Sequence, residues 1–210
     1  MTCRYERCYI TPAMGRLCFW PIVAAFGALW GVAEVTMGTF LHTLHIPFSG
    51  VFLACCGAAL LVAQRQVLNR PGAALATGFV TATIKTMSPG GAIIGPMLGI
   101  LVESILVEVC LLLLSRNLPG AMLGGAFVAV FAAFQKVFMQ FVYYGGNVIE
   151  LYLSILREAA DTLGLEETGR TLVCSLVLGG LGLVGAGFGV LGLVVGQKGA
   201  QRLAMAQGGR

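Results

Sequence analysis

The sequence predicts an all-α integral membrane protein: a helical bundle of six transmembrane helices with both termini on the cytoplasmic side. Of the 210 residues, 58% are hydrophobic and 10% are charged, whereas soluble domains average about 25% charged residues. Apolar runs near the roughly 20 residues that a spanning helix needs recur along the chain. Arginine and lysine gather in alternate connections, and this asymmetry predicts the orientation.

The predicted elements follow one another with mostly short polar connections. Residues 1–16 form a polar tail, residues 17–196 form one membrane domain, and residues 197–210 form a second tail. The connection at about 145–169 is amphipathic, which predicts an interfacial segment on the outer side. Within the domain, we expect spans at 17–41, 51–67, 72–87, 92–114, 121–144 and 171–195.

The basic residues orient this bundle. If the N-terminus is inside, the outer loops hold only Arg157 and Arg170. The inner segments then hold Arg4, Arg7, Arg16, Arg65, Arg70, Arg116, Lys198, Arg202 and Arg210. The positive-inside rule therefore predicts a multi-pass protein of the cell (inner or plasma) membrane with two cytoplasmic tails. The net charge of +4 gives no reason to expect a nucleic-acid partner.

A broken hairpin lies between the third and fourth predicted spans. Ser88-Pro89-Gly90-Gly91 interrupts the apolar sequence, because proline lacks an N–H and paired glycines permit any φ. Lys85 precedes this break, and Glu103 and Glu108 follow inside the next apolar run. Charges inside spans are expensive and normally face a partner, a cavity or a ligand.

Polar residues in four spans predict a binding pocket for a small polar molecule. By depth, Glu103 and Lys136 form its floor, and a loop from His42 to Gly50 lies at its mouth. The alternative is that Glu103–Lys136 and Glu34–Lys85 are structural ion pairs, although buried pairs stabilise poorly. No metal site is expected at the two histidines. The predicted substrate-binding residues are Glu34, His42, His45, Lys85, Glu103, Lys136, Gln140, Tyr143 and Asn147.

Small residues recur one helical turn apart in the first and last spans. The first span contains Ala24-x-x-x-Ala28 and Gly27-x-x-x-Gly31, and the last contains Gly185-x-x-x-Gly189 and Gly192-x-x-x-Gly196. Such pairs let helix backbones approach closely. They predict either packing within this bundle or, for Ala24, Ala28, Gly27 and Gly31 in particular, a docking face for another membrane subunit.

The chain resembles the substrate-binding S components of energy-coupling factor (ECF) transporters, which are a type of ABC transporter. Size, span count and orientation match along residues 17–196, and Ala24-x-x-x-Ala28 fits the motif by which that family docks on its coupling subunit. The resemblance implies a substrate site in the outer half, with the loop at 42–50 as a lid. Signature residues of the thiamine, riboflavin and biotin components are absent, so the subgroup's substrate is unknown.

The resemblance implies a non-enzymatic membrane subunit that captures a small nutrient, such as a vitamin or cofactor precursor. Uptake would then require a transmembrane coupling subunit and cytoplasmic ATPases, because no Walker A motif is present. No cofactor is expected. Three alternatives stay open: a stand-alone channel or proton- or cation-coupled carrier, an intramembrane enzyme using His42, His45 and Glu34, and a scaffold subunit without a ligand.

Overall fold

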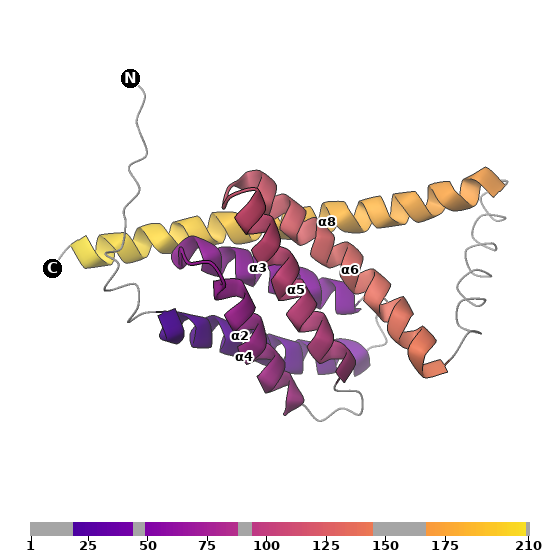
Figure 1. The fold of residues 1–210 in the computed structure, drawn as a ribbon, viewed down its shortest axis with the longest axis horizontal. Coiled ribbons are helices and arrows are strands. Elements are labelled where there is room, and N and C mark those ends of the chain that lie inside the picture. The colour runs from indigo at the N-terminus through magenta and orange to yellow at the C-terminus, as the bar shows by residue number, and fades with distance from the viewer. Residues whose placement is uncertain (1–18, 44–48, 88–93, 145–166, 209–210) are drawn as a thin grey trace, which may run out of the picture.

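The computed structural model describes residues 19–43, 49–87, 94–144 and 167–208 (Figure 1). Within these ranges the regular structure is entirely helical, as the apolar runs predict. The helices are α2 (Phe19–Thr43), α3 (Ser49–Val67), α4 (Ala73–Thr86), α5 (Ile94–Leu113), α6 (Leu118–Tyr144) and α8 (Glu167–Gly208).

Successive helices run in opposite directions. In Figure 1, α2 runs from left to right and α8 from right to left, and the other helices alternate between them. Interhelical contacts agree, since Gly27 and Gly31 of α2 face Val80 and Ile84 of α4 in a parallel arrangement. The ends of α3, α5 and α8 therefore lie with the beginnings of α2, α4 and α6, as an alternating bundle requires.

Five of the described helices are long and apolar enough to cross a membrane, which fits a multi-pass membrane protein. The exception is α4, whose 14 residues are too few for a full crossing. At 1.5 Å per residue it extends about 21 Å, compared with a hydrocarbon core of about 30 Å. The sequence already predicts this span to be the shortest. The candidate spans are Phe19–Gly38, Ser49–Val67, Ile94–Leu113, Leu118–Lys136 and Ser175–Met205.

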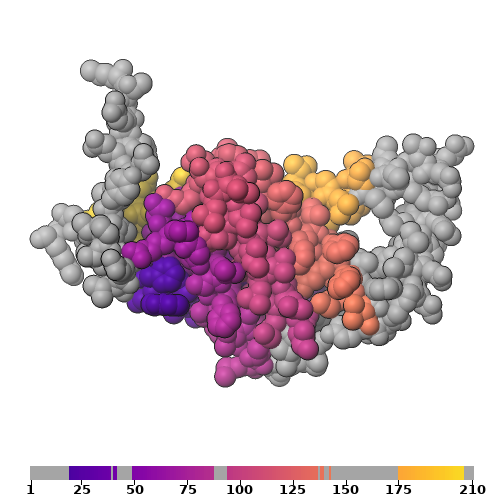
Figure 2. Space-filling model, viewed as in Figure 1, coloured from indigo at the N-terminus to yellow at the C-terminus, as the bar shows by residue number. Residues whose placement is uncertain are grey.

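The centre of the bundle is built around α3. Among the candidate spans, the one in α3 has the largest share of its residues buried, 61%. Trp30 of α2 packs on Gly57 of α3, where an added Cβ would lie 2.6 Å from the indole ring. In Figure 2, α5 and α6 cover the middle of the face turned to the viewer. Their outward side chains, including Leu98 and Phe134, are exposed and apolar, as expected for contact with lipid.

The long helix α8 packs on α3 and α6 through glycine. Gly185 and Gly189 approach the backbone of α6 so closely that an added Cβ would clash with it. Gly192 and Gly196 approach the backbone of α3 at Ala59 and Ala63 in the same way. The glycine pairs predicted in the last span therefore serve packing within this bundle.

Several predicted boundaries shift by a few residues; α3 begins at Ser49 rather than 51, and α8 begins at Glu167 rather than 171. The last helix continues through the expected tail to Gly208, because the polar segment after residue 196 contains good helix formers and no proline. The fifth helix begins at Leu118 rather than 121, since Pro119 is tolerated in a first helical turn. The break at 88–91 and the predicted interfacial segment up to residue 166 lie outside the described residues.

Candidate functional site

A buried ion pair joins the C-terminal parts of α2 and α4. Lys85 Nζ lies 3.3 Å from Glu34 Oε2 and donates a 3.0 Å hydrogen bond to the main-chain oxygen of Glu34. Glu34 is 8% exposed. This is the Glu34–Lys85 pair that the sequence offers as an alternative to an open pocket, and the structure forms it.

Glu103 lies deeper, in the middle of α5. It is 6% exposed, and its Oε2 has no hydrogen-bond partner among the described residues. Its carboxylate interacts electrostatically with Glu34, and also with Cys55 of α3. Helices α2, α3 and α5 therefore bring two carboxylates and a thiol together in the interior.

The indole of Trp30 belongs to the same region. Trp30 is 1% exposed and lies one turn before Glu34 on α2. Its Nε1 approaches the Glu34 carboxylate but lacks the geometry of a hydrogen bond. Cys56 of α3 also interacts electrostatically with Glu34. We call Trp30, Glu34, Cys55, Lys85 and Glu103 the interior cluster.

The predicted pair between Glu103 and Lys136 is wrong. Lys136 is exposed on α6, whereas Glu103 is buried, and no ion pair joins them. The preceding residue, Gln135, faces α5 instead, and its Nε2 donates a 2.7 Å hydrogen bond to the main-chain oxygen of Gly95. Gly95 lies eight residues before Glu103 on α5, so Lys136 is at a different level of the bundle, and it also lies on a different face, because one residue turns a helix by about 100°.

The remaining predicted substrate-binding residues cannot be placed. His45 and Asn147 lie outside the described residues, as does most of the loop up to Gly50. The backbones of the other three lie in helices, but their side chains are also outside the description; these residues are His42, Gln140 and Tyr143. Their roles stay predictions.

A second polar cluster, at the opposite end of the bundle, was not predicted. Arg65 Nη2 of α3 lies 3.3 Å from Glu108 Oε1 of α5, and both side chains are buried. Glu108 also accepts hydrogen bonds from the backbone N–H groups of Gly72, at 2.8 Å, and Ala74, at 2.9 Å. A carboxylate thus caps the N-terminus of α4, where exposed N–H groups favour negative charge.

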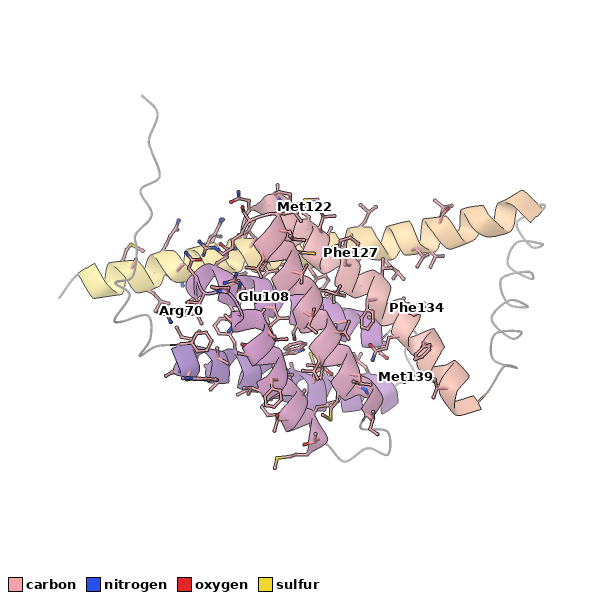
Figure 3. The ribbon with its side chains drawn as sticks, in the orientation of Figure 1. Arg70, Glu108, Met122, Phe127, Phe134 and Met139 are labelled. Carbon is pink, nitrogen blue, oxygen red and sulfur yellow. The ribbon has the colours of Figure 1, made fainter. Side chains whose placement is uncertain are left out.

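Neighbouring groups complete this end cluster. Arg65 Nη1 also donates to the main-chain oxygen of Arg70, and Arg116 Nη1 donates to that of Arg65 at 3.2 Å. Gln64 Nε2 donates to Thr77 Oγ1 at 2.6 Å, between α3 and α4. Figure 3 shows Arg70 and Glu108 toward one end of the bundle, with Met139 of α6 toward the other. The sequence signal was an arginine at a span end and a glutamate in a span, but nothing in it paired them.

The four small residues of the predicted docking face divide into two pairs. Gly27 and Gly31 are buried against α4, where an added Cβ would lie 2.7 Å from Val80 and 2.9 Å from Ile84. These two glycines therefore serve packing inside the chain. Ala24 and Ala28 are exposed, so they remain available to a partner.

The described residues include an open surface groove but no metal site. No three His, Cys, Asp or Glu residues within the described ranges lie close enough to hold a metal ion. An open groove of about 510 Å³ is lined by Phe19, Trp20, Arg70 and Pro71, near the start of α2 and far along the helices from Glu34.

Comparisons of the chain with protein-family models, with curated proteins and with solved structures found no match. The features that bear on function are therefore the interior cluster and the exposed alanines of α2, Ala24 and Ala28.

Proposed function

We propose that this chain is a membrane-embedded substrate-binding subunit. It captures a small nutrient from outside and passes it inward with the help of a separate transmembrane coupling subunit and cytoplasmic ATPases. This is the role of the ECF S components that the sequence resembles. In this proposal both termini are cytoplasmic, and the ends of α2 and α4 that carry Glu34 and Lys85 face outward.

The observation that carries the proposal is the interior cluster. Glu34 and Lys85 form a buried pair beneath the ends of two helices, and Glu103 lies below with an unpartnered oxygen. Polar groups inside a membrane domain are expensive, and they are typical of substrate or ion pathways. The end cluster around Glu108 already ties the helices together, so the fold does not need Glu103 for that purpose.

The exposed face of α2 supports a partner subunit. Ala24 and Ala28 lie one turn apart on the outside of the bundle, and small side chains there allow another helix to approach closely. Because Gly27 and Gly31 are already covered by α4, the docking face reduces to these two alanines.

The test is gentle-detergent purification of the tagged protein from its native membrane, followed by mass spectrometry of proteins and small molecules. We expect a second membrane protein and ATPase subunits to co-purify, together with a retained metabolite. Ala24→Leu should abolish co-purification without changing thermal stability, whereas Ala25→Leu, the same change on a neighbouring exposed position, should not. A wild-type protein that purifies alone and without a ligand would refute the proposal.

A second candidate is a stand-alone proton- or cation-coupled carrier. The observation that favours it is the unpartnered Glu103 Oε2 beside Glu34, since intramembrane carboxylates commonly lie on proton and ion paths. Uptake by the purified protein alone in liposomes, driven by an ion gradient and without ATP, would establish this candidate and exclude the first.

A further inference from the structure

The interior cluster contains two carboxylates and one ammonium group. Within the described residues, Lys85 Nζ donates hydrogen bonds to a single residue, Glu34, through the side-chain Oε2 and the main-chain oxygen. Glu103 therefore receives no hydrogen bond from the lysine. The formal charges of Glu34, Lys85 and Glu103 sum to one negative charge, and this charge lies in an apolar interior.

No other described side chain forms an ion pair with the carboxylate of Glu103. Lys136 of α6 is exposed, and Gln135 donates its amide to the main chain of Gly95. The α3 groups near Glu103 and Glu34 are the thiols of Cys55 and Cys56, which bring no positive charge.

Two buried polar atoms lack partners in the same region. Glu103 Oε2 and Trp30 Nε1 are both enclosed without a hydrogen bond, and their residues are 6% and 1% exposed. Most buried polar atoms in proteins are paired, and a buried carboxylate oxygen without a partner calls for an explanation such as a bound ion. Gln64 Oε1 and Arg65 Nε of the end cluster also lack partners among the described residues, but the carboxylate oxygen of Glu103 is the one that a cation would satisfy. Glu34 adds a second carboxylate to the cluster, and its charge acts unfavourably on that of Glu103. A positive occupant at the unpartnered Oε2 of Glu103 would relieve this.

We propose that the interior cluster binds a monovalent cation, with Glu103 Oε2 as its direct anionic partner and Glu34 as the second carboxylate of the cluster. The occupant is the ammonium group of an organic substrate, so this inference rests on the proposed function and names its substrate class. An inorganic cation such as sodium shares the same chemistry, and the experiment separates the two. An anionic substrate is excluded, because it would add to the negative charge that Glu103 already contributes.

The test uses the isolated full-length protein in detergent and measures its thermal unfolding midpoint. Chloride salts of methylammonium and of sodium are titrated against tetraethylammonium, a bulky quaternary cation without N–H donors, at constant ionic strength and constant pH. We expect methylammonium to raise the wild-type midpoint with a saturable dependence on concentration. Sodium producing the saturable rise in its place would keep the monocation site but assign it to an inorganic ion.

Three variants test whether the cation binds at Glu103. Glu103→Gln should raise the midpoint in tetraethylammonium and weaken the apparent affinity for the cation by about tenfold or more, because a charge-assisted contact is lost. Lys85→Gln should strengthen the affinity, since it releases Glu34. Glu108→Gln, the same substitution on the same helix, should lower the midpoint and keep the cation response.

Three results would overturn the proposal. The first is a wild type that responds to neither cation, and the second is a Glu103→Gln variant whose response equals that of the wild type. The third is a protein stabilised only by lowering the pH, which would make a proton the occupant of Glu103. None of these depends on a coupling subunit, so failure here is distinguishable from failure to co-purify a transporter.

Discussion

The end cluster allows a quantitative prediction about the ion pair between Arg65 and Glu108. At 3.3 Å and an effective dielectric constant of about 20, two unit charges attract by about 5 kcal/mol before desolvation. Desolvation offsets most of this, yet removing one partner alone leaves a buried charge and typically costs about 3–5 kcal/mol. For Glu108, the loss also releases the two N–H groups at the start of α4. We therefore expect Glu108→Leu to lower the free energy of unfolding by about 4 kcal/mol.

A double-mutant cycle tests the reasoning. Arg65→Met alone should also destabilise the protein by about 4 kcal/mol, because it leaves the Glu108 carboxylate buried without its guanidinium. The double variant Arg65→Met/Glu108→Leu replaces both charges with apolar groups. Its loss should fall short of the sum of the single losses by about 1–3 kcal/mol, which is the coupling expected for contacting residues.

The assay is titration with SDS in mixed micelles, followed by far-UV circular dichroism, with refolding checked on dilution. Additive single losses would show that the two side chains do not interact, and the geometry argued for the end cluster would then be refuted. Single losses below about 0.5 kcal/mol would refute the burial argument instead, since surface substitutions have effects of that size.

Three further predictions use the same assay. Gly192→Val should destabilise the bundle by about 1–3 kcal/mol or prevent folding, because an added Cβ meets the backbone of α3. The control, Gly187→Val, should be tolerated, because the space around Gly187 is open. Thr77→Val should cost about 1–2 kcal/mol, because the Gln64 amide loses its 2.6 Å hydrogen bond and keeps only the 3.4 Å one to the main-chain oxygen of Ala73. Adding Gln64→Leu to that variant should recover part of the loss, and no recovery would contradict the hydrogen-bond account. Gly72→Ala should cost about 1–2 kcal/mol despite open space around the residue, because Gly72 has φ of 84°; an unchanged stability would show that the left-handed conformation is not required.

The positions of the helices could be predicted from the sequence because bilayer thickness imposes a length on apolar runs. Each predicted span coincides with a described helix, with ends that differ by a few residues, except that α8 continues past its span to Gly208. The break expected at 88–91 has a local signal in the sequence, since proline and paired glycine act on their own backbone, and its residues lie outside the described ranges. Six membrane crossings and the sidedness of the termini stay predictions, because α4 is short and no bilayer side is marked by the fold.

Pairing between helices was harder to predict, because it depends on rotation about each helix axis. Glu34 and Lys85 were correctly matched by depth, and the two helices that carry them run in parallel. Lys136 and Glu103 differ in facing direction, and the Gln135–Gly95 hydrogen bond also places Lys136 beside the start of α5 rather than beside Glu103. Arg65 lies near the end of the predicted span 51–67, as expected. Nothing in the sequence indicated that its guanidinium pairs with the carboxylate of Glu108. In the structure, these rotations are fixed by the packing of glycines against neighbouring backbones. A single sequence does not show which backbone each glycine approaches.

The contrast between Glu103 and Glu108 is the strongest argument that the bundle contains a site and not merely a set of structural ion pairs. Both carboxylates are on α5, and both residues are 6% exposed. Glu108 has an arginine and two backbone N–H groups as partners, which is what a structural role requires. Glu103 has a repelling carboxylate nearby and an oxygen without a partner. A buried carboxylate that has no ion pair among the described residues and one oxygen without a partner is best explained by a positively charged occupant, so substitution of Glu103 should impair binding and leave the fold intact.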